Sequence, residues 1–233
     1  TAQGGQVTKV SNKLLKYTPP SKYVGTDTFQ YTIKDLTPLP ANSKTATATV
    51  TMTVKNDAPI PQDDVTTVIR TNSIEIDVLA NDVEPNNDPM TVVSVSAVNI
   101  GSSIASVILG GEKVKFVADR TMGSVSFTYE VADDLGLKST ATVVVEILNS
   151  KPVAQPMSAT TNWNHSVTIQ PNLPLDVDGD TVSVASHTQP THGRVTLSSG
   201  RFLYEPENGF VGTDTFTYTV TDGFDESTPA TIT

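Results

Sequence analysis

The 233 residues include 25 acidic and 15 basic side chains, which give a net charge of −10, and there is no Cys. The acidic balance argues against nucleic-acid binding, and no apolar run reaches the ~20 residues of a membrane span. The lack of Cys excludes thiol nucleophiles, thiolate metal sites and disulfides. Thr (35 residues) and Val (29 residues) favour strands, so we expect an all-β protein.

An internal repeat predicts the domain organisation. Residues 17–36 (YTPPSKYVGTDTFQYTIKDL) and 204–223 (YEPENGFVGTDTFTYTVTDG) are identical at 11 of 20 positions, and a weaker copy lies at 115–134. The matching Phe residues of the three copies are 98 and 89 residues apart, a period that suits one β-sandwich of ~100 residues.

Two Pro-containing segments mark the boundaries between the units. Pro59 and Pro152 each follow a β run closely, and Pro cannot donate a hydrogen bond to a sheet. We therefore predict three units, which comprise residues 1–56, 57–149 and 150–233.

The first unit, 1–56, corresponds only to the C-terminal part of the repeat, because Thr1 aligns with Thr188. Half a sandwich exposes apolar faces and open strand edges to water. We expect that the chain is a fragment of a longer array. The alternative is that a neighbouring chain completes the first unit by adding strands.

The second unit, 57–149, divides into seven apolar or alternating runs separated by clusters of Gly, Asn, Asp and Pro. We predict strands at 64–69, 73–80, 90–96, 104–109, 112–118, 124–132 and 139–148. Seven strands at this spacing predict a two-sheet Greek-key sandwich.

The VGTDTF motif of the third unit, 150–233, has a structural interpretation. Phe216 and Tyr218 alternate with Thr, which predicts a strand with one buried face. Gly212 is expected to supply a turn conformation, and Asp214 and Thr215 to bond backbone amides at the start of the strand.

The segments VLANDVEPNNDPMTVVSVS (78–96) and YEPENGFVGTDTFTYTVTDG (204–223) resemble the bacterial Ig-like, cadherin-like tandem repeats of large surface adhesins. The resemblance covers the whole chain, although MGSVSFTYEVADD in the second unit lacks the G-T-D triplet. It implies tandem immunoglobulin/cadherin-like sandwiches, an extracellular or cell-surface location and a role as a scaffold.

The acidic loops are the strongest functional signal. In DVDGD of the third unit, alternate carboxylates flank a Gly and can direct oxygens toward one Ca²⁺, which prefers 6–8 oxygen ligands. Greek-key topology places this loop, the loop before the last strand and the entering linker at the same end of a module. The candidate ligands in the third unit are Asp176, Asp178, Asp180 and Asp222. Those at the first junction are Asn56, Asp57, Glu84, Asn86, Asp88, Asp133 and Asp134.

Two features qualify this prediction. Asp, Asn and Gly form turns without any ligand, so the loops can also be plain solvated turns. The second linker, Asn149-Ser150-Lys151, offers no acid, so we expect the second junction to be the weaker one.

Catalytic motifs are absent from the sequence, so we expect no enzyme activity. The sequence favours a non-catalytic spacer or adhesion repeat of a large secreted or surface protein, with Ca²⁺ stiffening its junctions. One alternative is a segment of an extracellular filament or sheath, in which identical chains pair through strand edges. A second alternative is a carbohydrate-binding module, which needs an exposed aromatic platform. The ligand of a parent adhesin is not predicted.

Overall fold

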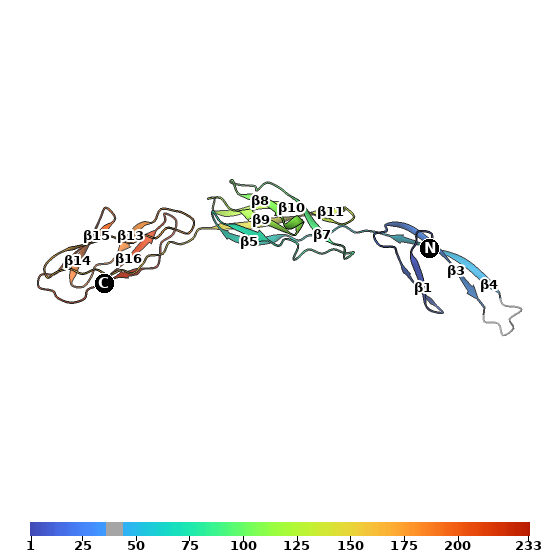
Figure 1. The fold of residues 1–233 in the computed structure, drawn as a ribbon, viewed down its shortest axis with the longest axis horizontal. Coiled ribbons are helices and arrows are strands. Elements are labelled where there is room, and N and C mark those ends of the chain that lie inside the picture. Colours follow the sequence, from blue (N-terminus) through green and yellow to red (C-terminus); the bar gives the residue numbers. More distant parts are fainter. Residues whose placement is uncertain (36–43) are drawn as a thin grey trace.

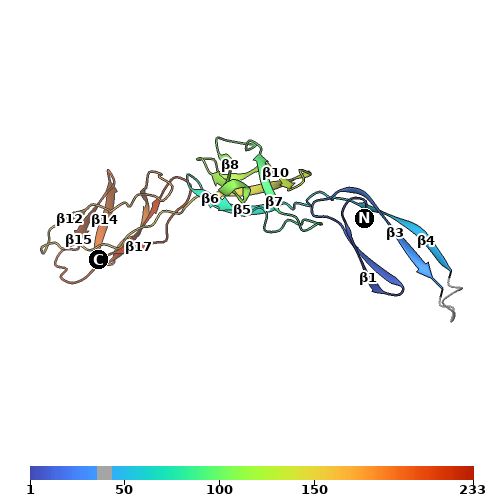
Figure 2. The ribbon, with the colours of Figure 1, turned by 45° about the vertical axis from the view of Figure 1, so that its right-hand side comes forward.

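The computed structural model describes residues 1–35 and 44–233 of the chain. Strands fold into three bodies that follow one another along an extended rod (Figures 1 and 2). In Figure 1 the first unit lies at the right, the second in the centre and the third at the left.

The second unit is a complete two-sheet sandwich. One sheet has the strand order β5-β11-β10-β7 and the other β6-β9-β8. The strands are β5 (Asp64–Ile69), β6 (Ser73–Ile76), β7 (Met90–Val95), β8 (Ile104–Ile108), β9 (Lys113–Val117), β10 (Gly123–Asp133) and β11 (Lys138–Leu148). A short 3₁₀ turn, η2 (Leu109–Gly111), joins β8 to β9. All seven predicted strands are therefore present.

One predicted strand was too long. The expected strand at 73–80 ends at Ile76, because the backbone then turns through hydrogen bonds from Ala80 N to Asp77 O and from Asp82 N to Leu79 O. Val78 within this turn is nonetheless fully buried. Its apolar side chain extends the strand-like pattern past the true end of the strand.

The core of the second unit lies between its two sheets. The alternating residues of β10 and β11 point inward, and Tyr129, Val131, Val143 and Val145 are each 0% exposed. The parallel pairing of β5 with β11, from Asp64↔Val143 to Leu148↔Ile69, places the entering and leaving strands side by side.

The third unit has a similar arrangement, in which β16 and β17 are much shorter than their equivalents β10 and β11. Its sheets have the orders β12-β15-β14 and β13-β16-β17. The strands are β12 (Val167–Ile169), β13 (Ser183–His187), β14 (Gly193–Ser198), β15 (Arg201–Pro206), β16 (Phe216–Thr221) and β17 (Ala230–Ile232). Phe202 and Tyr218 are buried at its centre, with ring centroids 5.5 Å apart.

The first unit consists of two hairpins, in which β1 pairs with β2 and β3 pairs with β4. The strands are β1 (Gln6–Ser11), β2 (Leu14–Thr18), β3 (Gly25–Lys34) and β4 (Thr45–Val54). Apolar side chains of these strands are exposed to solvent: Val10 is 58% exposed, Leu14 56% and Ile33 60%.

The VGTDTF motif has the structural role expected for it. Asp214 accepts hydrogen bonds from the backbone N–H groups of Thr191, His192 and Thr215, and from the hydroxyl of Tyr204. Gly212 has a φ of 154°, which a side chain would oppose. The motif therefore fixes the approach to β16.

The first unit repeats this arrangement. Asp27 accepts from the Tyr17 hydroxyl and from the backbone N–H groups of Gln3 and Thr28. The same Tyr–Asp pair thus occurs ten residues apart in both copies of the motif.

Candidate metal centre at the module junctions

The first junction brings together several of the predicted residues. Asn56 Nδ2 donates a 2.6 Å hydrogen bond to Asp133, and Asp57 N donates a 2.7 Å bond to Asn86. Burial opposes ionisation of Asp133, but the Asn56 and backbone hydrogen bonds outweigh it and lower its pKa. Linker and loops therefore meet as the topology predicts.

Other predicted residues of the first junction lie around this contact. Glu84 accepts from Asn86 N at 2.9 Å, and its second oxygen is buried with no partner in the described part of the chain. Asp134 forms an ion pair with Lys22 of the first unit, and Asp88 adds negative charge near the same Lys. A lysine thus already neutralises part of the acidic cluster.

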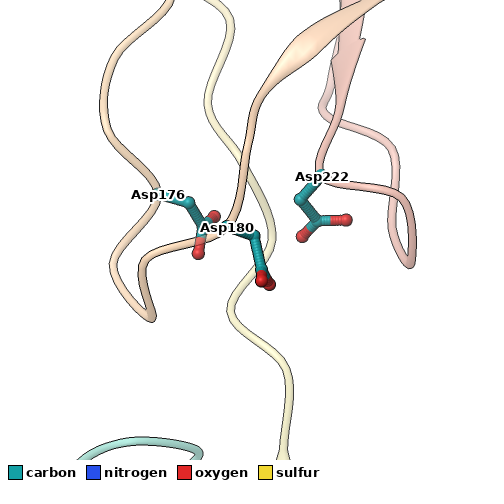
Figure 3. A group of neighbouring side chains, drawn as sticks. All are labelled: Asp176, Asp180 and Asp222. Atoms are coloured by element: carbon teal, nitrogen blue, oxygen red, sulfur yellow. The ribbon is translucent and has the colours of Figure 1, made fainter. Parts of the chain in front are cut away.

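The tightest carboxylate cluster lies at the second junction. Oxygens of Asp176, Asp180 and Asp222 lie within 4.8 Å of one another, and these residues form the one such acidic group among residues 1–35 and 44–233. Asp176 and Asp180 come from the DVDGD loop and Asp222 from the end of β16, and they face one another across the linker (Figure 3). The expectation of a weaker second junction was therefore wrong for the carboxylates.

The DVDGD loop is a hydrogen-bonded turn. Asp178 N donates to Asp176 Oδ1 at 3.0 Å, and Gly179 N donates to Asp176 O at 3.2 Å. Gly179 has a φ of 84°, a left-handed conformation that Gly adopts without strain. This turn holds the alternate Asp side chains toward the linker.

The linker adds an amide group to the cluster. Asn149 Nδ2 donates to Asp222 at 2.8 Å and to Asp225 at 2.9 Å, while Ser150 N donates to Asp178 Oδ2 at 2.9 Å. Asn149 thus takes the position that Asn56 takes at the first junction. An amide oxygen can also serve as a Ca²⁺ ligand, so a linker without an acid can still contribute to a site.

Three oxygens in this cluster lack partners. Asn149 Oδ1, Asp176 Oδ2 and Asp178 Oδ1 are buried and have no hydrogen-bond donor among the described residues when both carboxyls are ionised. Asp176 and Asp178 are 8% and 2% exposed. Burying unpaired acceptors is costly, and a cation can satisfy several of them at once.

A buried Arg from the second unit also enters the cluster. Arg70, which follows β5, is 2% exposed and donates from Nε to Asp178 Oδ2 at 2.9 Å. Its guanidinium also pairs with Asp180 and lies 4.4 Å from the ring centroid of Phe224. Arg120 of the second unit reaches Asp180 at 3.2 Å. These contacts tie the second unit directly to the third.

The two central carboxyls have opposite pKa shifts. Burial and the neighbouring Asp178 raise the pKa of Asp176. Burial opposes ionisation of Asp178 too, but hydrogen bonds from Asp176, Ser150 and Arg70 together lower its pKa to about 2. The cluster therefore holds a shared proton or needs further positive charge.

The spacing of the three carboxylates Asp176, Asp180 and Asp222 is compatible with one shared cation. Ligand oxygens ~2.4 Å from one ion are at most ~5 Å apart, which agrees with the 4.8 Å cluster. The residues that would supply oxygen ligands to a bound Ca²⁺ are Asp176, Asp178, Asp180, Asp222 and Asn149. Arg70 competes for two of these carboxylates.

The sequence reasoning missed Arg70 and Asn149. A signal existed for Asn149, since it and Asn56 occupy equivalent linker positions. No local pattern distinguishes Arg70 from other basic residues, because its partners lie more than a hundred residues further along the chain.

Two of the three histidines pack against aromatic rings. The His187 ring lies edge-on to Phe202 with centroids 5.6 Å apart, and the His192 ring stacks on Phe210 at 4.5 Å. Within residues 1–35 and 44–233, no helix is long and apolar enough to cross a membrane.

Comparison with solved structures finds protocadherin, desmocollin and titin domains at low sequence identity. A protocadherin gammaB4 extracellular domain is 12% identical over 98% of this chain and 43% of its own, with a TM-score of 0.37. Titin domains A168–A170 are 11% identical over 100% and 83%, with a TM-score of 0.39. The human desmocollin-1 ectodomain is 13% identical over 89% and 46%, with a TM-score of 0.29. The chain thus spans less than half of the protocadherin and desmocollin chains.

No curated protein matches the sequence. A family model does match it, three times and over nearly its whole length: residues 1–53, 56–146 and 149–233 each fit the bacterial Ig domain. The chain belongs to the bacterial Ig domain family and carries three tandem copies of its repeat.

Proposed function

We propose that the chain is a non-catalytic spacer in a large secreted or cell-surface bacterial protein, and that Ca²⁺ stiffens its junctions. Three family repeats in series and their rod-like arrangement support the spacer role. The observation that carries the Ca²⁺ proposal is the set of buried, unpartnered oxygens at the second junction, beside three convergent carboxylates.

The second junction is suited to a mechanical role because both units supply the residues. Arg70 belongs to the second unit, Asp178 and Asp222 to the third, and Asn149 to the linker between them. An ion held by the loop, β16 and the linker would restrict bending at this point. At ~10 mM Ca²⁺ and a dissociation constant of ~1 mM, one site adds about 1.4 kcal/mol of stability.

Thermal unfolding of the full chain tests this proposal. The only Trp, Trp163, lies in the third unit and reports its unfolding by fluorescence. In ~10 mM Ca²⁺ we expect a melting temperature several degrees above that in excess EGTA, with a much smaller rise in Mg²⁺. Small-angle scattering should show a narrower distribution of end-to-end lengths in Ca²⁺.

Two variants make the test specific. Asp176→Asn with Asp222→Asn should abolish the Ca²⁺ response. Glu75→Gln with Glu205→Gln removes the same number of charges from exposed strand positions and should preserve it. A response that survives in the first variant, or that Mg²⁺ reproduces fully, would contradict the proposed site.

A second candidate function is assembly into a filament or sheath. The exposed apolar residues of the two hairpins in the first unit, such as Val10 and Ile33, favour it because sheets with such faces associate in water. Sedimentation velocity should then show oligomers that grow with protein concentration. A monomer at all concentrations would exclude it.

A further inference from the structure

The second unit has an uncharged strand edge along one side of its sandwich. No charged side chain lies between Asp88 and Glu112, the segment that contains β7, β8 and η2. β8 is an outer strand of the sheet β6-β9-β8 and pairs with β9 on one side. Its other side has no strand neighbour in the described part of the chain. The backbone groups on that side are a ready template for a further strand.

The equivalent strands of the other two units each carry a basic residue. This strand opens a hairpin in every unit: β8 pairs with β9, β14 with β15 and β1 with β2. β14 contains Arg194 and β1 contains Lys9, and both side chains are exposed. A charge on an edge strand opposes its pairing with another chain. β8 has neither a charge nor a Pro, and its register with β9 is regular, so it is the unprotected edge of the three.

The other strand edge on this side of the second unit, β7, is less suited to pairing. Its register with β10 shifts between Glu130 and Val131, and such an irregularity twists an edge away from a new strand. An exposed ion pair between Lys138 and Glu130 also lies on the adjoining strands. β8 is therefore the edge that a further strand fits best.

The sequence of β8 is complementary to itself in antiparallel register. Ala105 and Val107 pack against the core of the second unit. Side chains alternate along a strand, so Ile104, Ser106 and Ile108 lie on the outer face. With a two-fold axis at Ser106, Ile104 of one copy stands opposite Ile108 of the other. Because Ile104 is 61% exposed, this pairing would cover an apolar side chain at each end of the contact.

A second copy in this register also has complementary charge along the rod. The strands of the second unit run roughly along the rod, and the two sheets of a sandwich align within ~30°, so antiparallel β8 strands place two rods side by side in opposite directions (Figure 1). The first unit of each copy then lies beside the third unit of the other. Residues 1–56 have seven Lys and two Asp, a net charge of +5, whereas residues 150–233 have three basic and nine acidic side chains, a net charge of −6. These opposite charges attract each other, and the uncharged edge brings no like charges together at the contact itself.

We propose that β8 is the docking edge for a second copy of this chain, and that the two copies form a closed antiparallel dimer in which both β6-β9-β8 sheets become one continuous sheet. The contact joins two rods side by side, which goes beyond the spacer role, and it does not depend on Ca²⁺. A pairing of two five-residue strands is a small interface, so we expect a dissociation constant of roughly 10–100 µM.

Sedimentation velocity and small-angle scattering of the full chain test the assembly. Between ~1 µM and ~500 µM we expect a monomer–dimer equilibrium that stops at two copies, because a two-fold contact is closed. The longest dimension of the dimer should stay close to that of the monomer, because the axis passes through the central unit. The dimer should weaken at least threefold between ~50 mM and ~500 mM NaCl. A monomer throughout, an end-to-end dimer or an open-ended series of oligomers would overturn the proposal.

A pair of matched variants tests the edge. Ser106→Lys places two ammonium groups opposite each other at the two-fold axis and should raise the dissociation constant at least tenfold. Ser106 is exposed, so the monomer should keep its melting temperature. Ser73→Lys adds the same charge at an exposed position of β6, the opposite edge of the same sheet, and should leave the dimer intact. Equal effects of the two variants would contradict docking at β8.

A single introduced Cys tests the register, because the chain has no Cys of its own. Residues directly opposite each other in antiparallel strands are close enough for a disulfide. Under mild oxidation Ser106→Cys should therefore form a covalent dimer at least tenfold faster than Ser94→Cys, which lies at an exposed position of β7. Equal rates would overturn the register. A dimer that Ile33→Lys abolishes and Ser106→Lys leaves intact would move the contact to the first unit.

Discussion

The two junctions have the same linker residue, an Asn, but different basic side chains next to their carboxylates. Asn56 and Asn149 each donate a hydrogen bond to an Asp where a strand ends: Asp133, the last residue of β10, and Asp222, the residue after β16. The nearby cation is Lys22 at the first junction, 59% exposed, whereas Arg70 at the second is almost completely buried.

This difference teaches that a repeated linker does not make the junctions mechanically equal. An exposed Lys–Asp pair contributes little, because water and salt screen it. A buried guanidinium with several fixed partners orients both units, and removing it leaves carboxylates without a counter-charge. The second junction should therefore be the stiffer one even without metal.

The largest expected effect comes from removing Arg70. Arg70→Met retains apolar bulk but leaves Asp178 and Asp180 buried without their cation, which should cost roughly 3–5 kcal/mol in EGTA. Chemical unfolding followed by far-UV circular dichroism, which reports on all three units, measures it. Lys22→Met is the matched control at the first junction and should change little. Equal effects of both variants would remove the distinction between the junctions.

The linker asparagines should show a smaller difference. Asn149→Ala loses hydrogen bonds to two carboxylates, Asp222 and Asp225, and should cost roughly 2–3 kcal/mol. Asn56→Ala loses one such bond and should cost about half as much. Asn172→Ala, at an exposed loop position, serves as the control. A larger loss for Asn56 than for Asn149 would reverse the ranking of the junctions.

The stability of the second unit should also depend on pH through a carboxyl group outside the junctions, Asp64. Burial and the charge of Asp82 raise the pKa of Asp64 in the second unit from 3.8 to about 6. The folded state therefore holds the proton more tightly than the unfolded state, and this stabilisation is present below pH ~4 and lost as pH rises through ~6. The loss should be roughly 1–2 kcal/mol.

Asp64→Asn should flatten this part of the pH profile. The third unit has Met157 at the corresponding position, so its pH profile should be the same with and without this substitution. Differential scanning calorimetry between pH 4 and pH 7 resolves the two units. A pH-dependent loss that persists in Asp64→Asn would assign it to another group.

Much of the fold was predictable because it depends on local alternation. The seven strands of the second unit follow from runs such as SVSFTYEVA, in which every second residue is apolar, and Gly or Asp clusters separate the runs. The end of β6 was missed because Val78 is buried from within a turn, which alternation cannot distinguish from a strand.

The candidate site was only partly predictable. DVDGD and the loop after β16 could be placed at one end of the third unit from topology alone, and the structure brings Asp176, Asp180 and Asp222 together. The role of Arg70 could not be predicted, because it depends on how two units pack against each other. The contribution of Asn149 could not be inferred from charge, because its side chain is a neutral amide.

The parallel pairing of β5 with β11 has a consequence for force. β5 enters from the first junction and β11 leaves toward the second, so tension along the rod pulls these neighbouring strands in opposite directions. Their hydrogen bonds, from Val143↔Asp64 to Leu148↔Ile69, are then loaded together in shear and must break almost simultaneously.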